Sequence, residues 1–202
     1  DEIWCQMFSE PGSGSDLASL STKAVDDGDG YIVNGQKVWT TLGHLAKWGL
    51  LVTRTDPDVP KHRGLTFFIV DMESDGVEVR PLRQITGEAE FNEVYFTDVK
   101  IPKENMLGNL GDGWRVSLTV LMNERVAIGG NVRERGTGAP GHLVQLWNDK
   151  ELDDPVSRDK LIKLWIEQES IRLTNIRATE NREKGTPGPE GSTSKLHEAE
   201  IN

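Results

Sequence analysis

The sequence predicts an α+β protein, in which an antiparallel β-barrel or β-sandwich domain over residues 1–110 is followed by a partial α-helical bundle over residues 111–202. Two observations lead to this fold class. Up to about residue 105, short β-rich runs alternate with Gly, Pro, Asp and Asn, which is typical of strands joined by turns. After residue 109, apolar residues recur with helical spacing instead.

Seven strands are expected in the first domain. Turn-forming stretches separate them, for example Asp26–Gly30 and Ser74–Gly76. An Asn34-Gly35 pair inside the third run indicates a tight hairpin there. Closely spaced short strands are typical of antiparallel barrels and sandwiches. The expected strands are Ile3–Phe8, Ser19–Val25, Tyr31–Thr40, Gly49–Arg54, Leu65–Asp71, Val77–Leu82 and Phe91–Ile101.

The second domain carries helix start and stop signals. Asp154 followed by Pro155 is a capping residue with proline at the first helical position, and Gly185 is a stop signal. The expected helices are one capped by Asp112 that extends to Ile128, a short one at His142–Trp147, a long one from Pro155 to about Arg182, and one that begins at Ser192.

Charge and cysteine content limit the possible functions. With 23 basic and 33 acidic residues the formal net charge is −10, which argues against nucleic acid or an anionic membrane as the main partner. Cys5 is the single cysteine, so we expect a buried strand residue and a reducing compartment, either a bacterial cytoplasm or, in a eukaryote, the mitochondrial matrix. No apolar run approaches the roughly 20 residues that span a bilayer. The chain opens without Met and ends on a polar stretch, so we expect a fragment.

Two segments carry residues suited to binding a flat ligand. Phe8–Asp16 is rich in Gly and Ser, which allow close backbone approach and supply hydroxyl donors. It lacks the lysine of a P-loop, so a nucleoside-triphosphate site is not expected. Asn34–Thr41 ends in a Trp followed by two Thr, which can flank a conjugated ring. The alternatives are an ordinary loop and an ordinary hairpin with a core Trp.

These two segments are followed by further motifs in a characteristic order. The later motifs are Ala46–Trp48, Gly64–Val70 and Phe96–Pro102. Together the series resembles the middle β-domain and the following helix of the acyl-CoA dehydrogenase family, closely over residues 1 to about 130 and more loosely to 202. Gly188–Ser192 resembles a branch that is common among bacterial members.

The resemblance implies non-covalent FAD as cofactor and places several residues around it. Gln6, Phe8 and Ser9 would lie along the flavin ring, with Ser9 hydrogen bonded to it. Ser15 would contact the flavin or the acyl-CoA. The family fold comprises a helical domain, a middle β-barrel and a second helical bundle, with the flavin at a subunit interface, so a homodimer or homotetramer is implied and a heteromer remains an alternative.

The same resemblance assigns the reactive face of the flavin and the catalytic base. Trp39 would pack beside the isoalloxazine, and the hydroxyl of Thr41 would point at its reactive nitrogen. The reaction needs a carboxylate that removes the proton α to the thioester carbonyl, and Glu124 is the candidate; the alternative is a base in a later segment. Arg125 would contact the substrate. The structural alternatives are a surface glutamate and a bundle ion pair.

The expected activity is α,β-dehydrogenation of an acyl-CoA to the 2-enoyl-CoA, with electrons passed to an electron-transfer flavoprotein. The alternatives are an oxygen-using acyl-CoA oxidase or flavin monooxygenase, a non-catalytic subunit of a heteromeric dehydrogenase, and a plain β-sandwich binding module. Glu88 and Glu90 are interpreted as a polar turn and not as a glycosidase pair. The four histidines have no zinc-like spacing, so no metal is expected.

Overall fold

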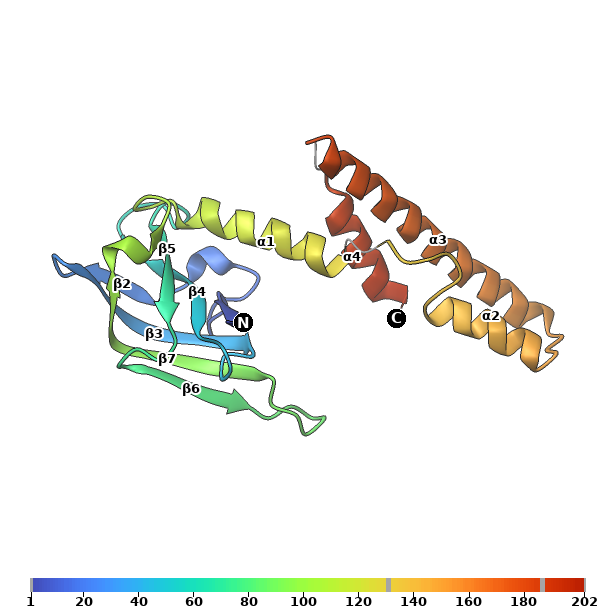
Figure 1. Cartoon of the computed structure of the whole chain (residues 1–202), viewed down its shortest axis with the longest axis horizontal. Helices are drawn as coiled ribbons and strands as arrows, with labels where there is room; N and C mark the ends of the chain where they lie inside the picture. Colours follow the sequence, from blue (N-terminus) through green and yellow to red (C-terminus); the bar gives the residue numbers. More distant parts are fainter. Residues whose placement is uncertain (1, 130–131, 186–187, 202) are drawn as a thin grey trace. The chain divides into compact units, whose positions relative to one another are not determined.

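The computed structural model of the protein describes residues 2–129, 132–185 and 188–201. The chain divides into two compact units, Asp1–Thr119 and Val120–Asn202. The first contains the strands and the start of the first long helix, and the second contains the remaining helical residues (Figure 1).

The first unit is built on one sheet of eight strands in the order β6-β7-β3-β2-β4-β5-β8, with β1 added beside β4. Most neighbours are antiparallel, as expected, but β1 and β2 both pair with β4 in parallel. In this mixed sheet β3 and β4 are interior strands, each with a neighbouring strand on both sides (Figure 1). The strands are β1 Trp4–Met7, β2 Lys23–Asp26, β3 Gly30–Thr41, β4 Trp48–Arg54, β5 Leu65–Asp71, β6 Val77–Leu82, β7 Phe91–Pro102 and β8 Met106–Leu107.

The structure confirms the seven predicted strands and adds β8. Among the seven, β2 is shorter than predicted. β2 begins at Lys23 and not at Ser19, because Leu17–Ser19 forms a turn of 3-10 helix. The backbone amides of Ser21 and Thr22 donate to the Glu10 carboxylate, at 2.6 and 2.9 Å, and are therefore unavailable to a strand.

The predicted hairpin at Asn34-Gly35 is wrong. Both residues lie inside β3, where a register shift against β7 falls between Val33 and Gly35. Gly35 has φ +153°, and an added Cβ would lie 2.5 Å from the Thr22 hydroxyl. The glycine is therefore required for close packing within the sheet and not for chain reversal.

The core of the first unit lies between the strands. Most of its largest fully buried side chains come from β3, β4, β5 and β7, and Met7 of β1 and Leu20 complete the set. Cys5 is 4% exposed, as predicted, and burial raises the pKa of its thiol to about 12. The central cluster includes Met7, Tyr31, Val33, Leu51, Phe68, Val70, Val94, Phe96, Val99 and Ile101.

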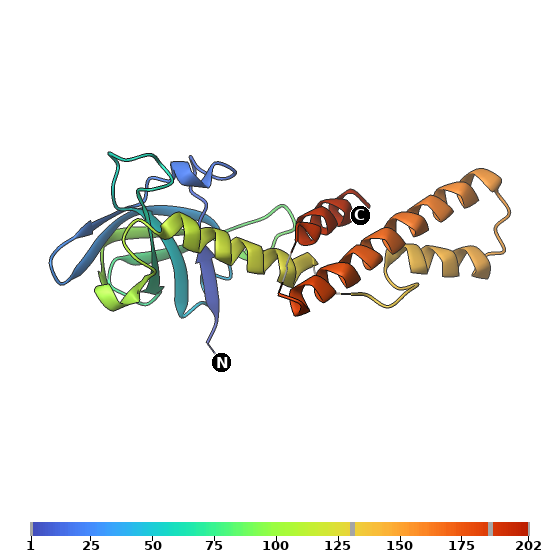
Figure 2. The same cartoon turned by 90° about the horizontal axis from the view of Figure 1, so that it is seen from above.

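Four helices complete the described residues: α1 Gly113–Gly129, α2 Ala139–Asp149, α3 Pro155–Glu183 and α4 Glu190–Ile201. Within the second unit, α2 and α4 both pack against α3 (Figure 2). Asp154 caps α3 as predicted, accepting the Ser157 amide at 2.9 Å. α4 begins two residues before the predicted start at Ser192. No helix among the described residues combines the length and hydropathy needed to cross a membrane.

Candidate functional site

The segment Gln6–Ser9 is held against two interior strands of the first unit. Gln6 lies on β1, opposite Leu50 of β4, and is half-buried. Phe8 is buried, and its ring meets the ring of Phe67 edge-on at 5.7 Å. The Ser9 carbonyl accepts the backbone N–H of Val38 at 2.9 Å, so this segment is joined directly to β3.

Trp39 lies close to the end of β3 and is unusually exposed for an aromatic residue in a strand. The residue is 62% exposed, and its backbone has φ +61°, a left-handed conformation that costs an L-residue roughly 1–2 kcal/mol. A second register shift against β7 falls between Lys37 and Thr40 and accommodates this turn of the chain. The fold therefore presents the indole to solvent at an energetic cost, which is typical of a ligand-binding position.

The residues that follow Trp39 differ in their surroundings. Thr40 is fully buried and its hydroxyl has no hydrogen-bond partner, while its carbonyl accepts Asn92 Nδ2 at 2.9 Å. Thr41 is exposed and pairs with Phe91 of β7. Trp39 and Thr41 thus place an exposed aromatic ring and an exposed threonine at the same strand end. Their predicted place beside a conjugated ring remains a proposal.

A buried ion pair connects these two segments, and the sequence interpretation missed it. Lys37 Nζ donates to Glu10 Oε1 at 2.9 Å and to the Phe8 carbonyl at 3.0 Å. The side chains of Lys37 and Glu10 are 0% and 4% exposed. One signal was available: Lys37 follows Tyr31, Val33 and Gly35 at intervals of two, so β alternation places it on the inward face.

The electrostatic surroundings of the two charges differ. Burial opposes ionisation of Glu10, but the charge of Lys37 and the hydrogen bonds from Thr22 and Ser21 outweigh it and lower the carboxyl pKa to about 2. Lys37 has fewer compensating partners, so burial lowers its pKa to about 8 despite Glu10. Glu10 is therefore a firmly ionised acceptor at neutral pH.

Ser15 lies on the exposed loop that follows Glu10 in the chain. Backbone hydrogen bonds between Glu10 and Ser13 close the loop, and Asp16 pairs with Lys61 at 2.7 Å. Arg54 donates to the carbonyls of Ala18 and Leu20 farther along. The structure thus places Ser15 on a loop anchored at both ends.

The predicted base and its neighbour lie on α1, in its later turns. The Glu124 side chain is 31% exposed, and Oε1 lies 3.7 Å from Lys195 Nζ of α4. The side chain of Arg125 lies outside the described residues. The predicted catalytic role of Glu124 remains a proposal.

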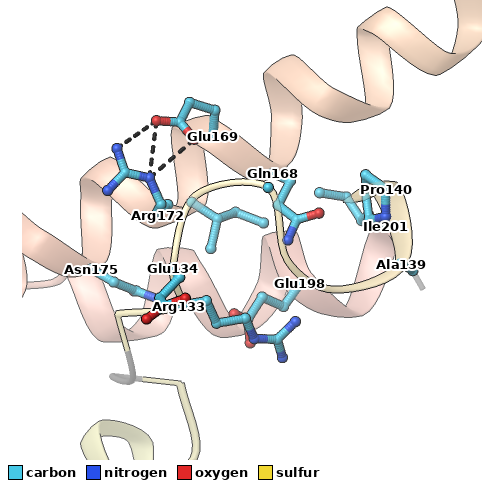
Figure 3. A pocket seen from close by; sticks show the side chains of 12 residues that line it. Arg133, Glu134, Ala139, Pro140, Gln168, Glu169, Arg172, Asn175, Glu198 and Ile201 are labelled. Atoms are coloured by element: carbon cyan, nitrogen blue, oxygen red, sulfur yellow. Dashed lines mark hydrogen bonds and ion pairs between the residues drawn. The ribbon is translucent and has the colours of Figure 1, made fainter. Parts of the chain in front are cut away.

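Other candidate groups do not converge into a site. Glu88 and Glu90 are both exposed in the turn before β7. Among the described residues, no group of three or more His, Cys, Asp and Glu side chains is placed to hold a metal ion. A pocket in the second unit lies between α3, α4 and the chain before α2, with Gln168, Glu169, Arg172 and Glu198 in its lining (Figure 3). Glu169 and Arg172, two of the charged residues in this lining, form an ion pair with each other at 2.5 Å.

Comparison with known proteins decides which family this arrangement belongs to. The model of the acyl-CoA dehydrogenase middle domain matches residues 5–99, and the model of the acyl-CoA dehydrogenase C-terminal domain matches residues 111–202. The chain belongs to the acyl-CoA dehydrogenase family. The middle-domain match includes both segments of the candidate site.

Two curated members of the acyl-CoA dehydrogenase family from Mycobacterium tuberculosis align along nearly the whole chain. Acyl-CoA dehydrogenase FadE34 is 46% identical over 200 residues, which is 96% of this chain and 27% of FadE34. Acyl-CoA dehydrogenase IpdE1 is 39% identical over 206 residues, which is 96% of this chain and 51% of IpdE1. The chain therefore spans about a quarter of one relative and about half of the other.

Solved acyl-CoA dehydrogenase structures share the fold. The Tcur3481-Tcur3483 steroid ACAD is 28% identical with a TM-score of 0.83, covering 100% of this chain and 52% of that chain. An acyl-CoA dehydrogenase from Geobacillus kaustophilus is 29% identical with a TM-score of 0.81, covering 99% and 55%. These likenesses confirm the predicted fold class of an acyl-CoA dehydrogenase fragment.

Proposed function

We propose that the full-length protein containing this chain oxidises an acyl-CoA thioester to the 2-enoyl-CoA with FAD and passes the electrons to an electron-transfer flavoprotein. The observation that carries the proposal is the exposed indole of Trp39, held at φ +61° next to the exposed Thr41. Membership of the acyl-CoA dehydrogenase family supplies the reaction class.

The residues present fit a flat cofactor. The Trp39 indole offers an apolar face, and Thr41, Ser9 and Ser15 offer hydroxyl donors on neighbouring segments. The candidate segments also lie on elements held by backbone hydrogen bonds, including that from Val38 to Ser9. In this proposal Gln6, Phe8 and Ser9 form one side of the flavin site and Trp39 and Thr41 the other.

The chemistry divides between the cofactor and the protein. FAD, when bound, accepts the hydride from the β carbon of the substrate. Glu124 removes the proton from the α carbon, which the thioester carbonyl makes acidic, and Arg125 and Ser15 orient the acyl-CoA. A base in a later part of the full-length protein is the alternative to Glu124.

The substrate and assembly follow from the relatives. Because one similar solved structure is that of a steroid ACAD, we propose a lipid or steroid-derived acyl-CoA as substrate. A homodimer or homotetramer would complete the flavin site, and a heteromer is the second candidate, since a similar solved structure is the ChsE4-ChsE5 complex. The bacterial relatives support a cytoplasmic location.

The test is anaerobic reduction of the flavin in the full-length protein by straight-chain and steroid-derived acyl-CoAs, followed by absorbance. Glu124→Gln should abolish bleaching while leaving FAD bound. The matched control is Glu180→Gln, because Glu180 is also a helical glutamate paired with a lysine, Lys184, at 3.8 Å. The control should bleach as the wild type does.

The other outcomes separate the rivals. Bleaching in Glu124→Gln at the wild-type rate would move the base elsewhere and keep the enzyme class. Rapid reoxidation by oxygen after bleaching would indicate an oxidase or monooxygenase. Bound flavin without bleaching by any thioester would contradict the proposed reaction and favour a non-catalytic subunit.

A further inference from the structure

The buried pair Glu10–Lys37 is expensive for the fold. Both side chains are almost completely removed from solvent, at 4% and 0% exposure. Desolvating two charges costs several kcal/mol per ion, and an apolar pair of similar volume is often as stable or more so. Stability alone therefore gives no reason for this pair at this place.

What the pair connects gives a better reason. Lys37 Nζ reaches back to the carbonyl of Phe8, and Glu10 accepts the amides of Ser21 and Thr22. The backbone of residues 8–10 is thereby attached to β3 on one side and to the entry of β2 on the other. Each contact fixes main-chain atoms and not only side chains.

The position of Lys37 on β3 places it next to a second link between the two segments. Lys37 precedes the register shift that turns Trp39 into its left-handed conformation. On the next residue, Val38 N–H donates to the Ser9 carbonyl at 2.9 Å. The two segments that carry the candidate cofactor residues are thus joined by two adjacent links, one charged and one through the backbone.

We propose that Glu10 and Lys37 are positioning residues, which hold the Phe8–Ser9 backbone and the Trp39–Thr41 strand end in a fixed relation so that both face one flat cofactor. This inference rests on the proposed flavin site and adds to it residues that do not touch the cofactor. Loss of the pair should change how tightly and in what environment the flavin is held, beyond any loss of stability.

The test uses the full-length protein stripped of flavin and titrated with FAD, with fluorescence quenching as the affinity readout and the flavin absorption spectrum as the second. Lys37→Met and Glu10→Gln should weaken FAD binding at least tenfold and shift the flavin absorption bands. Each single variant leaves one charge unpaired, so a drop in melting temperature is also expected.

Two further variants separate positioning from stability. The double variant Glu10→Gln/Lys37→Met leaves no unpaired charge, so its melting temperature should recover while FAD affinity stays weak. Val99→Ala truncates a fully buried side chain of the core in β7 and should lower the melting temperature with FAD affinity within about threefold of wild type.

The outcomes are distinct. Wild-type affinity and spectrum in the double variant would overturn the positioning role while leaving the proposed function intact, as would an equal loss of affinity in Val99→Ala. A wild-type protein that binds no FAD would overturn both the pair's role and the proposed function.

Discussion

The ring of Trp39 meets the ring of Phe91 edge-on, with centroids 6.3 Å apart and planes at 83°, while Trp39 as a residue is 62% exposed. The contact holds part of the indole against Phe91 of β7 and leaves much of the residue accessible. Because the backbone at Trp39 is left-handed, the strand presents this aromatic residue at a conformational cost.

That cost predicts an unusual order of stabilities at this position. Glycine adopts φ +61° freely, so Trp39→Gly should be more stable than Trp39→Ala by about 1 kcal/mol. At the neighbouring Val38, which has no positive φ, the order should reverse, with Val38→Ala the more stable. Urea unfolding of the four variants measures both differences. Equal values for the two Trp39 variants would contradict backbone strain at this site.

A second prediction concerns Gly35, whose hairpin assignment from sequence was wrong. Gly35→Ala would place a methyl group 2.5–2.8 Å from atoms of Thr22 in an unfavourable backbone conformation, so we expect a loss of about 2 kcal/mol in unfolding free energy. Gly14→Ala is the control, because nothing lies within 4 Å of its added Cβ. Thermal and urea unfolding compare the two. A neutral Gly35→Ala would show that β3 and Thr22 separate easily.

A third prediction follows from the ionisation of Glu10. Its pKa of about 2 in the folded state lies below the ordinary value of 4.5, so the stabilisation is complete above pH 4.5 and is lost as pH falls toward 2. The shift corresponds to about 3 kcal/mol. Urea unfolding between pH 6 and pH 2.5 should show a steeper loss in the wild type than in Glu10→Gln.

The control for this measurement is Glu78→Gln, which removes an exposed carboxylate paired with Arg80. Its pH dependence should stay close to that of the wild type, since exposed pairs contribute little. Parallel curves for the wild type and Glu10→Gln would mean that Glu10 ionises alike in the folded and unfolded chain.

The strands and helices were largely predictable because their signals are local. Asp154-Pro155 marked the start of α3, and a short β-rich run between Gly64 and Asp71 marked β5. The parallel pairing of β1 with β4 was not predictable in this way, because the contact joins Trp4 to Trp48 across more than forty residues. Local periodicity carries no information on which distant strands become neighbours.

The residues of the candidate site could be proposed from the sequence, but the contacts that connect them could not. Trp39 and Thr41 were chosen for chemistry that a sequence displays, namely an aromatic ring and a hydroxyl. The left-handed backbone of Trp39 and the buried contact between Lys37 and Phe8 depend on the register of β3 against its neighbours. Register is set by packing of the whole sheet, so a linear motif does not reveal it.

The location of β3 within the sheet has a consequence for engineering. Its amides bond to β2 near one end and to β7 along most of the strand, so hydrogen exchange there requires opening of the sheet and should be slow. Trp39 and Thr41 belong to this strand, whereas Ser15 lies on a loop. Directed evolution of ligand preference in this unit should therefore accept changes in residues 11–16 more readily than in β3.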